Sequence, residues 1–244
     1  MQRDAAAATT VEATAPRGSP IAVEAFIFDM DGTMIDSMPW HAKAWVEFTR
    51  RRGMAIDVPD LMARTTGRNG TECIRELLQR EVDQAEADAL TREKEDIYRE
   101  LFGPSFTEVA GFRAFAAHAS TRGYKLAVGT AGDIHNVAFA MSRLAMEPEP
   151  LTIVRGDEGL PGKPQPAIFL EAARRIGAAP ERCIVFEDAP FGIEAARRAG
   201  MHAVAVCSTH SAQELAGPHV LAAVRDYHEL MNTDFLERIH VAIA

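Results

Sequence analysis

The sequence has few cysteines, no long apolar segment and no excess of positive charge. Its three cysteines, Cys73, Cys183 and Cys207, lie far apart and form no C-x-x-C pair. This argues against a zinc site and predicts a reducing, cytoplasmic environment. The longest uncharged apolar runs, such as residues 220–224, are far shorter than the roughly 20 residues of a membrane-spanning helix. With 26 basic and 35 acidic side chains the net charge is −9, which makes a nucleic-acid-binding surface unexpected.

The remaining composition is that of an ordinary globular protein. The 244 residues are 47% hydrophobic and 25% charged, and a chain of this length buries a sizeable core without disulfides or metals. At about 150 residues per domain, it forms one or two domains. Residues 1–20 lack both regular periodicity and the apolar stretch of a secretory signal, so we predict a disordered tail there. We expect no membrane or nucleic-acid partner; the sequence does not fix the oligomeric state, although a monomer is favoured.

Short apolar runs that alternate with helical patterns predict a parallel sheet. Residues 21–28 are almost continuously apolar, which is typical of a strand covered on both faces. Similar runs recur at residues 125–129, 151–154, 183–186 and 202–206. Helical patterns that end near glycine or proline lie among them at residues 111–122, 134–146, 165–176 and 192–199. This alternation predicts an α/β fold with a Rossmann-like, doubly wound parallel sheet.

Residues 39–103 interrupt the alternation, because they contain helical patterns and no convincing strand. The predicted helices cover residues 39–52, 58–65, 70–81 and 84–102. Their apolar residues recur at the spacing of amphipathic helices. We therefore predict two domains, a core formed by residues 21–37 and 109–244 and an all-helical insertion formed by residues 38–108.

The acidic segment after the first predicted strand carries the strongest functional signal. Asp29 and Asp31 stand where that strand ends, and open α/β sheets bind ligands at the carboxyl ends of their strands. Two carboxylates this close repel each other unless a cation or a proton lies between them. An EF-hand calcium loop is excluded, because it needs a glycine and a glutamate where this chain has Met34 and Trp40.

Polar side chains also follow the later strands. Thr130 and Ala131 begin a turn whose backbone N–H groups suit an anion. Lys163 precedes a proline, which places it on a loop at the start of a helix. Glu187 and Asp188 follow the run at residues 183–186. Carboxylates, a hydroxyl and one lysine from four strand ends are the groups that phosphoryl transfer with Mg²⁺ requires.

The motifs DMDGT, GT, KP and FEDA, in this order, resemble those of the haloacid-dehalogenase-like (HAD) phosphohydrolases over about residues 21–207. The helical insertion is similar to the cap domain of their β-phosphoglucomutase-like branch. The stretch FEDAPFGIEAARRAGM is similar to bacterial sugar-phosphate phosphatases of the fructose-1-phosphate type. The resemblance implies a Mg²⁺-dependent phosphatase that acts on a small phosphorylated metabolite, such as a sugar phosphate, through an aspartyl phosphate.

The resemblance also implies roles for individual residues. Asp29 would be the nucleophile, and Asp31 would be the general acid and then the general base. Thr130 would bind a phosphate oxygen beside Ala131. Lys163 would pair with Asp29 and with the group being transferred.

The Mg²⁺ ligands follow from the same resemblance. The Asp29 side chain, the Asp31 carbonyl and Asp188 would hold the ion. Glu187 would be a further ligand or would lie directly behind the ligands.

Three residues of the insertion are candidates for substrate binding. Arg68 and Asn69 lie between two predicted helices, where the family places its substrate-selecting loop. His41 matches a histidine that the phosphatases and the mutases share, although a structural role is equally compatible with a single histidine. Arg68 would bind a second anionic group or would be a simple exposed loop residue.

Two other functions compete with the phosphatase. A β-phosphoglucomutase-type mutase would use the same two aspartates. The mutases carry an arginine where this chain has Gly70, two residues after Arg68, so we favour the phosphatase. Lys94 does match a mutase lysine, or it pairs with an acidic neighbour. A phospho-accepting receiver domain also uses an aspartate, but it is much shorter than this chain and needs an acidic pair on an earlier strand.

Overall fold

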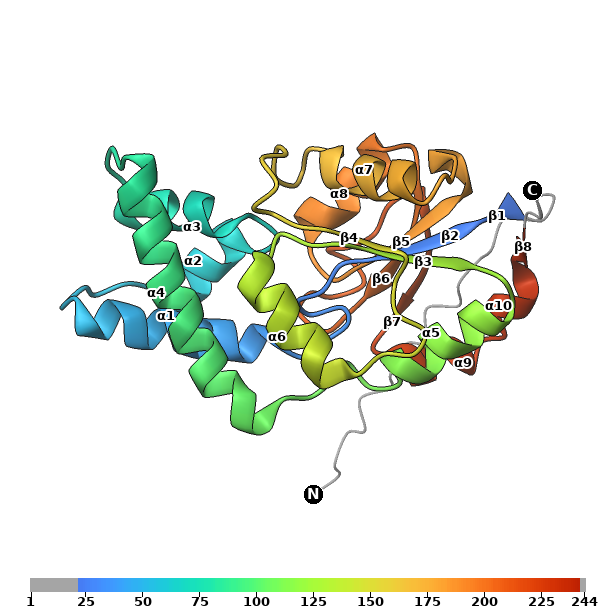
Figure 1. Ribbon diagram of the computed structural model, residues 1–244, viewed down its shortest axis with the longest axis horizontal. Coiled ribbons are helices and arrows are strands. Elements are labelled where there is room, and N and C mark those ends of the chain that lie inside the picture. The colour runs from blue at the N-terminus through green and yellow to red at the C-terminus, as the bar shows by residue number, and fades with distance from the viewer. Residues whose placement is uncertain (1–21, 242–244) are drawn as a thin grey trace, which may run out of the picture.

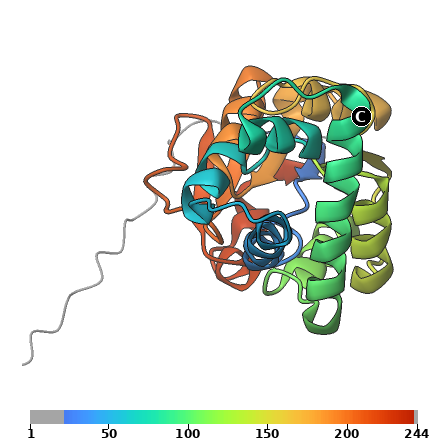
Figure 2. The ribbon, with the colours of Figure 1, turned by 90° about the vertical axis from the view of Figure 1, so that its left-hand side faces the viewer.

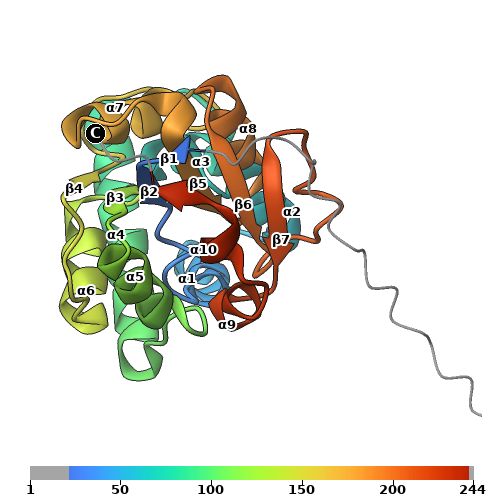
Figure 3. The same cartoon turned by 90° about the vertical axis from the view of Figure 1, so that its right-hand side faces the viewer.

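A parallel six-stranded sheet forms the centre of the protein. The computed structural model describes residues 22–241, and the strands lie in the order β4-β3-β2-β5-β6-β7 (Figure 3). They are β2 (Ala25–Phe28), β3 (Lys125–Gly129), β4 (Thr152–Val154), β5 (Cys183–Glu187), β6 (His202–Val206) and β7 (Val220–Val224). The chain crosses over at β2, which pairs with β3 on one side and with β5 on the other. The predicted doubly wound α/β fold is confirmed; the predicted tail at residues 1–20 lies outside the described residues.

Three strands differ from the prediction. Residues 21–28 do not form one strand, because the chain divides at Glu24, whose N–H donates to the Arg182 carbonyl at 2.8 Å. The short β1 (Ala22–Val23) instead pairs with β8 (His240–Val241) in a separate two-stranded sheet. Neither β8 nor β7 is predicted from the sequence; β7 lies at the edge of the main sheet and is mostly only half-buried.

Both faces of the sheet are covered by helices. Successive side chains of a strand point to opposite faces, so Phe26 and Phe28 of β2 pack on one face while Ala25 and Ile27 pack on the other. The phenylalanine face is covered by α5 (Phe112–Thr121), α6 (Ile134–Leu144), α9 (Tyr227–Met231) and α10 (Phe235–Arg238). The other face is covered by α7 (Ala167–Arg175) and α8 (Pro190–Arg198), which lie above the sheet in Figure 1.

Four helices, called the helical block below, lie between β2 and β3 in the sequence. They are α1 (Met38–Arg51), α2 (Val58–Thr65), α3 (Gly70–Leu78) and α4 (Gln84–Phe102), and they agree with the predicted helices to within a few residues. Asp57, Asn69 and Asp83 begin α2, α3 and α4, because each side chain accepts a backbone N–H of the first turn. The block stands at one end of the core, and Figure 2 shows it from that side.

The chain enters and leaves the helical block through two segments that lie side by side. Ile35 and Glu108 form an antiparallel bridge, and the Asp36 N–H donates to the Thr107 carbonyl at 3.1 Å. The domain boundaries predicted from the sequence fall beside this bridge. Within residues 22–241, no helix combines the length and the apolar character needed to cross a bilayer.

Candidate active site

The carboxyl ends of the strands and the helical block enclose a cleft of about 590 Å³. Core residues that line it and were predicted from the sequence are Asp29, Asp31, Thr130, Ala131, Glu187 and Asp188. The helical block contributes the predicted residues His41, Arg68 and Asn69, and also Lys94. The predicted site residues therefore meet around one cleft, with Lys163 buried directly beneath it.

Lys163 lies between two carboxylates at the floor of the cleft. Its Nζ donates to Asp29 Oδ1 at 2.5 Å and to Glu187 Oε1 at 2.7 Å. The other carboxylate oxygen of Glu187 accepts the Ala189 N–H at 2.8 Å. A side chain at Gly192 would be impossible here, because its Cβ would lie 1.7 Å from Glu187 Oε1. Since both of its oxygens are engaged, Glu187 is better placed to orient Lys163 than to bind a metal directly.

Negative charge is in excess in this buried region. Burial raises the pKa of Asp29 to about 8; Lys163 opposes that rise and Glu187 adds to it. Burial and the charges of Glu187 and Asp29 likewise hold the pKa of Asp188 well above its ordinary value. Burial alone would lower the pKa of Lys163, but Asp29 and Glu187 raise it above its ordinary value. Three buried carboxylates thus face one ammonium, an arrangement that a divalent cation neutralises.

Asp188 is held in place by hydroxyl groups. Thr33 Oγ1 donates to its Oδ1 at 3.3 Å, and Thr209 Oγ1 donates to its Oδ2 at 2.5 Å. Among residues 22–241, no three His, Cys, Asp or Glu side chains form a ready-made metal site. Mg²⁺ commonly takes only one or two carboxylates and keeps water and phosphate oxygens as its other ligands. Asp29 and Asp188, with a backbone carbonyl, fit that requirement.

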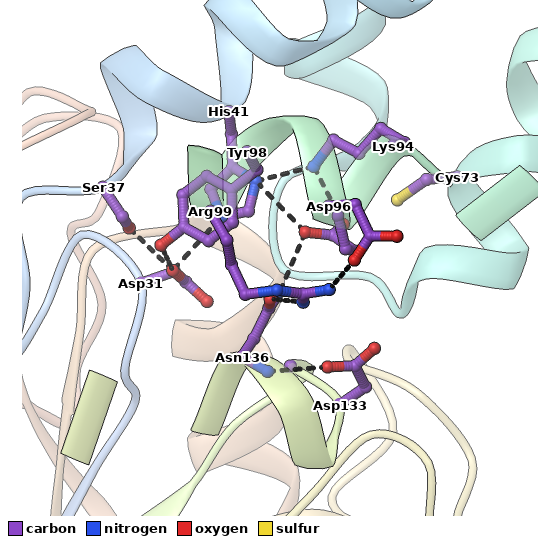
Figure 4. A network of polar contacts seen from close by, with 12 residues as sticks. Asp31, Ser37, His41, Cys73, Lys94, Asp96, Tyr98, Arg99, Asp133 and Asn136 are labelled. Carbon is purple, nitrogen blue, oxygen red and sulfur yellow. Dashed lines mark hydrogen bonds and ion pairs between the residues drawn. The ribbon is translucent and has the colours of Figure 1, made fainter. Parts of the chain in front are cut away.

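The Asp31 carboxylate accepts three hydrogen bonds at one oxygen (Figure 4). Ser37 Oγ donates to Asp31 Oδ1 at 2.7 Å, His41 Nε2 lies 3.2 Å away, and the Tyr98 hydroxyl lies 3.4 Å away. Burial alone would raise the pKa of Asp31. The electrostatic interaction and hydrogen bond with His41, the hydrogen bond from Ser37 and the positive charge of Lys94 lower it below its ordinary value. Asp31 is therefore ionised at neutral pH.

His41 connects Asp31 to a buried lysine of the helical block. Lys94 Nζ lies 2.6 Å from His41 Nδ1 and 2.9 Å from Glu95 Oε1. Because an ammonium has no acceptor, His41 Nδ1 must accept, and the ring proton on Nε2 is then donated to Asp31. The imidazole also stacks on the Tyr98 ring, with 3.8 Å between the centroids. Lys94 thus pairs with an acidic neighbour and contacts the site as well.

A tight turn at the end of β3 leads into α6. The Thr130 N–H donates to the Val154 carbonyl at 3.0 Å, and Thr130 Oγ1 accepts the Gly132 N–H at 3.0 Å. Since this oxygen accepts there, the hydroxyl proton of Thr130 can be donated into the cleft. Asp133 begins α6 by accepting the Asn136 N–H at 2.8 Å. The turn therefore presents a hydroxyl and a helix N-terminus to the cleft, which suits an anion.

The sequence model of the haloacid dehalogenase-like hydrolase family matches residues 23–200. This chain belongs to the haloacid dehalogenase-like hydrolases. The prediction of an enzyme of the HAD phosphatase class is therefore confirmed, and a receiver domain is excluded.

Within the HAD hydrolases, the chain is similar to a sugar-phosphate phosphatase and to a β-phosphoglucomutase. Fructose-1-phosphate phosphatase YqaB of Escherichia coli (strain K12) is 36% identical over 182 residues, which are 74% of this chain and 94% of that protein. β-Phosphoglucomutase of Bacillus subtilis (strain 168) is 30% identical over 194 residues, 75% of this chain and 83% of that protein. The crystal structure of a hydrolase from Pseudomonas syringae superposes with a TM-score of 0.77 at 26% identity, covering 86% of this chain and 97% of that one.

The loop between α2 and α3 of this HAD hydrolase reaches over the cleft. The guanidinium of Arg68 lies 5.1 Å from the ring centre of Phe191 at the start of α8, and its Nη1 is 3.8 Å from Glu76 Oε2. The Asn69 side chain accepts the Glu72 N–H at 3.0 Å and so begins α3. Asn69 therefore shapes the loop, while the guanidinium of Arg68 is one-third exposed and is only loosely paired.

Three residues of the HAD site were not predicted from the sequence, because none of them belongs to a recognisable motif. Ser37 and Tyr98 donate to Asp31, and Thr209, from the loop after β6, donates to Asp188. Ser37 directly follows the acidic motif, which is the only sequence signal among the three. Tyr98 and Thr209 reach the site from distant parts of the chain.

Proposed function

We propose that this protein is a Mg²⁺-dependent phosphomonoester hydrolase that acts on a small phosphorylated sugar or polyol. The observation that carries the proposal is the arrangement of Asp29, Asp31 and Lys163. Asp29 meets the Lys163 ammonium at the floor of the cleft, and Asp31, two residues on, is held by donors from the helical block. This arrangement supports attack by the first carboxylate and proton transfer by the second. A cytoplasmic location and a monomeric state remain predictions from composition.

In the proposed reaction, the Asp29 carboxylate attacks phosphorus and takes up the phosphoryl group. Lys163 offsets the negative charge that gathers between Asp29 and the phosphate, and Thr130 donates to a phosphate oxygen. Asp31 gives a proton to the leaving oxygen and later takes one from the water that hydrolyses the intermediate. Asp31 is ionised in the free protein, so this proton arrives with the substrate, whose phosphate charge raises the proton affinity of the carboxyl.

The side chains of Asp29 and Asp188 and the carbonyl of Asp31 would hold Mg²⁺. The ion, when bound, neutralises charge on the phosphate oxygens. We further propose that residues 38–108, which include the helical block, form a cap domain hinged beside the Ile35–Glu108 bridge. Closure of this cap would exclude water while the phosphoryl group transfers.

The charges of the cleft favour a phosphatase over a mutase. A mutase must bind a second phosphate. Among the basic side chains that line the cleft, Lys94 is paired with Glu95 and Arg68 faces Glu76. Arg92 also lines the cleft but is exposed, and the acidic side chains outnumber these cations. Further acidic side chains line the same cleft, namely Asp88, Asp133 and Asp157. Hydroxyl and amide side chains complete its wall, namely Thr65, Thr66, Asn69, Thr71, Gln84 and Thr91. Such a wall can bind the hydroxyl groups of a substrate that carries one phosphate. The similarity to a fructose-1-phosphate phosphatase also favours a phosphatase.

The mutase remains the second candidate, since Lys94 contacts His41 and a β-phosphoglucomutase is 30% identical. One experiment separates the two. The protein is incubated with Mg²⁺ and a panel of hexose, pentose and polyol monophosphates, and both inorganic phosphate and isomeric sugar phosphates are measured. We expect stoichiometric phosphate release, and none from Asp29→Asn. Isomerisation of β-glucose 1-phosphate faster than its hydrolysis would assign the mutase, and full activity of Asp29→Asn would refute the nucleophile.

A further inference from the structure

A buried polar contact joins the helical block to the core on the far side of His41 and Lys94 (Figure 4). Asn136 on α6 donates from Nδ2 to Glu95 Oε2 on α4 at 2.8 Å, and its Oδ1 accepts Arg99 Nη1 at 2.5 Å. The other oxygen of Glu95 accepts Lys94 Nζ at 2.9 Å. Asn136 is only 3% exposed. A single core side chain thus binds two residues of α4 one helical turn apart.

We propose that Glu95, Arg99 and Asn136 form a latch, called the α4–α6 latch, that holds the helical block against the core. By the same contacts the latch fixes Lys94, and through Lys94 it fixes His41 against Asp31. Asn136 and Glu95 also line the cleft, and by these contacts we assign them as positioning residues for the acid–base group. This inference rests on the proposed function of Asp31.

The position of Asn136 in its helix links the latch to the phosphate-binding turn. Its backbone N–H donates to Asp133, which begins α6 directly after the Thr130 turn. The N-terminus of α6 therefore faces the cleft, and a side chain of the same first turn forms the latch. A phosphoryl group bound at Thr130 would fix the turn that carries Asn136. Through the contacts of the latch with Lys94, it would also fix the position of His41. Filling the phosphate site and placing the proton donor are thereby coupled.

The rest of the α4–α6 contact is apolar and lies nearer the hinge. Phe139, one turn beyond Asn136, packs against Tyr98 and Phe102 with ring centroids 6.0 and 5.9 Å apart. Phe106, which follows the helical block, also contacts Phe139. An apolar contact tolerates sliding, whereas a buried carboxylate loses much when its hydrogen-bond donor withdraws. The polar end of the contact is therefore the part that distinguishes a closed block from an open one.

The test uses Asn136→Leu, which keeps the branched shape of the side chain but removes both hydrogen bonds, together with Glu95→Gln and the double variant. Thr49→Val is the matched control, because Thr49 is buried in α1 and bonds only to carbonyls of its own helix. The readouts are kcat and KM for a substrate from the panel, and amide hydrogen exchange of peptides covering residues 90–99. We expect kcat of Asn136→Leu to fall about 10- to 100-fold, the range of one hydrogen bond to a charged group, with a smaller change in KM.

The latch predicts further results for the double variant, for hydrogen exchange and for the control. The loss in the double variant should be smaller than the sum of the two single losses, because both substitutions remove the Asn136–Glu95 hydrogen bond. Exchange in residues 90–99 should accelerate in Asn136→Leu but not in Thr49→Val, whose kcat should stay within about twofold of wild type. Unchanged kcat in Asn136→Leu, or an equal loss in Thr49→Val, would overturn the latch. If the wild-type protein hydrolyses no phosphomonoester, the proposed function fails, while unchanged exchange in Asn136→Leu refutes the latch independently.

Discussion

Gly32→Ala should inactivate the protein by displacing the Asp188 carboxylate. Gly32 has φ +79°, and a Cβ built on it would lie 2.3 Å from Asp188 Oδ2 and 2.6 Å from Asp188 Cγ. Ordinary contact begins at 3.4 Å, so Asp188 has to move by about 1 Å. Thr33 and Thr209 hold that carboxylate in its present position, and such a movement weakens both hydrogen bonds.

Two effects add in this variant. Alanine in a left-handed conformation costs about 1–2 kcal/mol. Weakening a hydrogen bond to a charged group costs about 1.5–3 kcal/mol more. We therefore expect a loss of about 2.5–5 kcal/mol of unfolding free energy. Since a displacement of about 1 Å in a catalytic site lowers rates by about 100-fold, phosphatase activity should fall at least that far.

Gly53→Ala separates the two effects. Gly53 also has a positive φ of +63°, but no atom lies within 4 Å of the Cβ that alanine would add. This control should lose only the backbone contribution of about 1–2 kcal/mol and keep its activity. Urea unfolding and phosphate release at saturating Mg²⁺ measure both quantities. Equal activity of Gly32→Ala and Gly53→Ala would refute the assignment of Asp188 to the site.

Three further outcomes follow from the site. EDTA should abolish hydrolysis and Mg²⁺ should restore it, because the buried carboxylates outnumber Lys163; EDTA-resistant turnover would exclude the metal site. Arg68→Ala should raise KM several-fold more than it lowers kcat, since a remote contact contributes uniform binding, and the reverse pattern would place Arg68 in the chemical step. In metal-free protein the pKa of Asp29 is about 8 against an ordinary 3.8, so folding favours its protonated form. The stability from this group is complete below about pH 4 and is lost as the pH rises through 8. The urea midpoint of unfolding is measured for the wild type and for Asp29→Asn between about pH 4 and pH 8. The midpoint of the wild type should fall relative to that of the variant as the pH rises, and a constant difference would contradict the raised pKa.

The fold was predictable wherever burial imposes a simple pattern. A central strand covered on both faces is almost continuously apolar: β2 is apolar throughout, and β3 and β5 are so except for Lys125 at the start of β3 and Glu187 at the end of β5. Edge strand β7 is half-exposed, so its short apolar run resembles many other segments. The starts of the helices that were predicted agree to within about two residues, and at α2, α3, α4 and α6 an Asp or Asn side chain that bonds to the first turn marks the start locally. The short helices α9 and α10 were not predicted.

The site was predictable where it follows the strand ends and not where it depends on contacts between distant helices. Asp29, Lys163 and Asp188 each follow a strand, and parallel strands bring their carboxyl ends to one edge. No periodicity reveals that Lys94 reaches His41 or that Asn136 reaches Glu95, because these contacts depend on how α4 packs against α1 and α6. The sequence left the partners of Lys94 open for that reason.

The bridge between Ile35 and Glu108 bears on the order in which the chain folds. Phe28 at the end of β2 and Lys125 at the start of β3 are separated by about 100 residues, and pairing these strands must close that loop. If the four helices assemble first and the bridge joins their ends, the effective loop shrinks to about 25 residues. Loop-closure entropy grows as 1.5 RT ln n, so this order saves about 1 kcal/mol in forming the central strand pair. A large insertion therefore need not slow the folding of the sheet it interrupts, provided that it folds before the sheet closes.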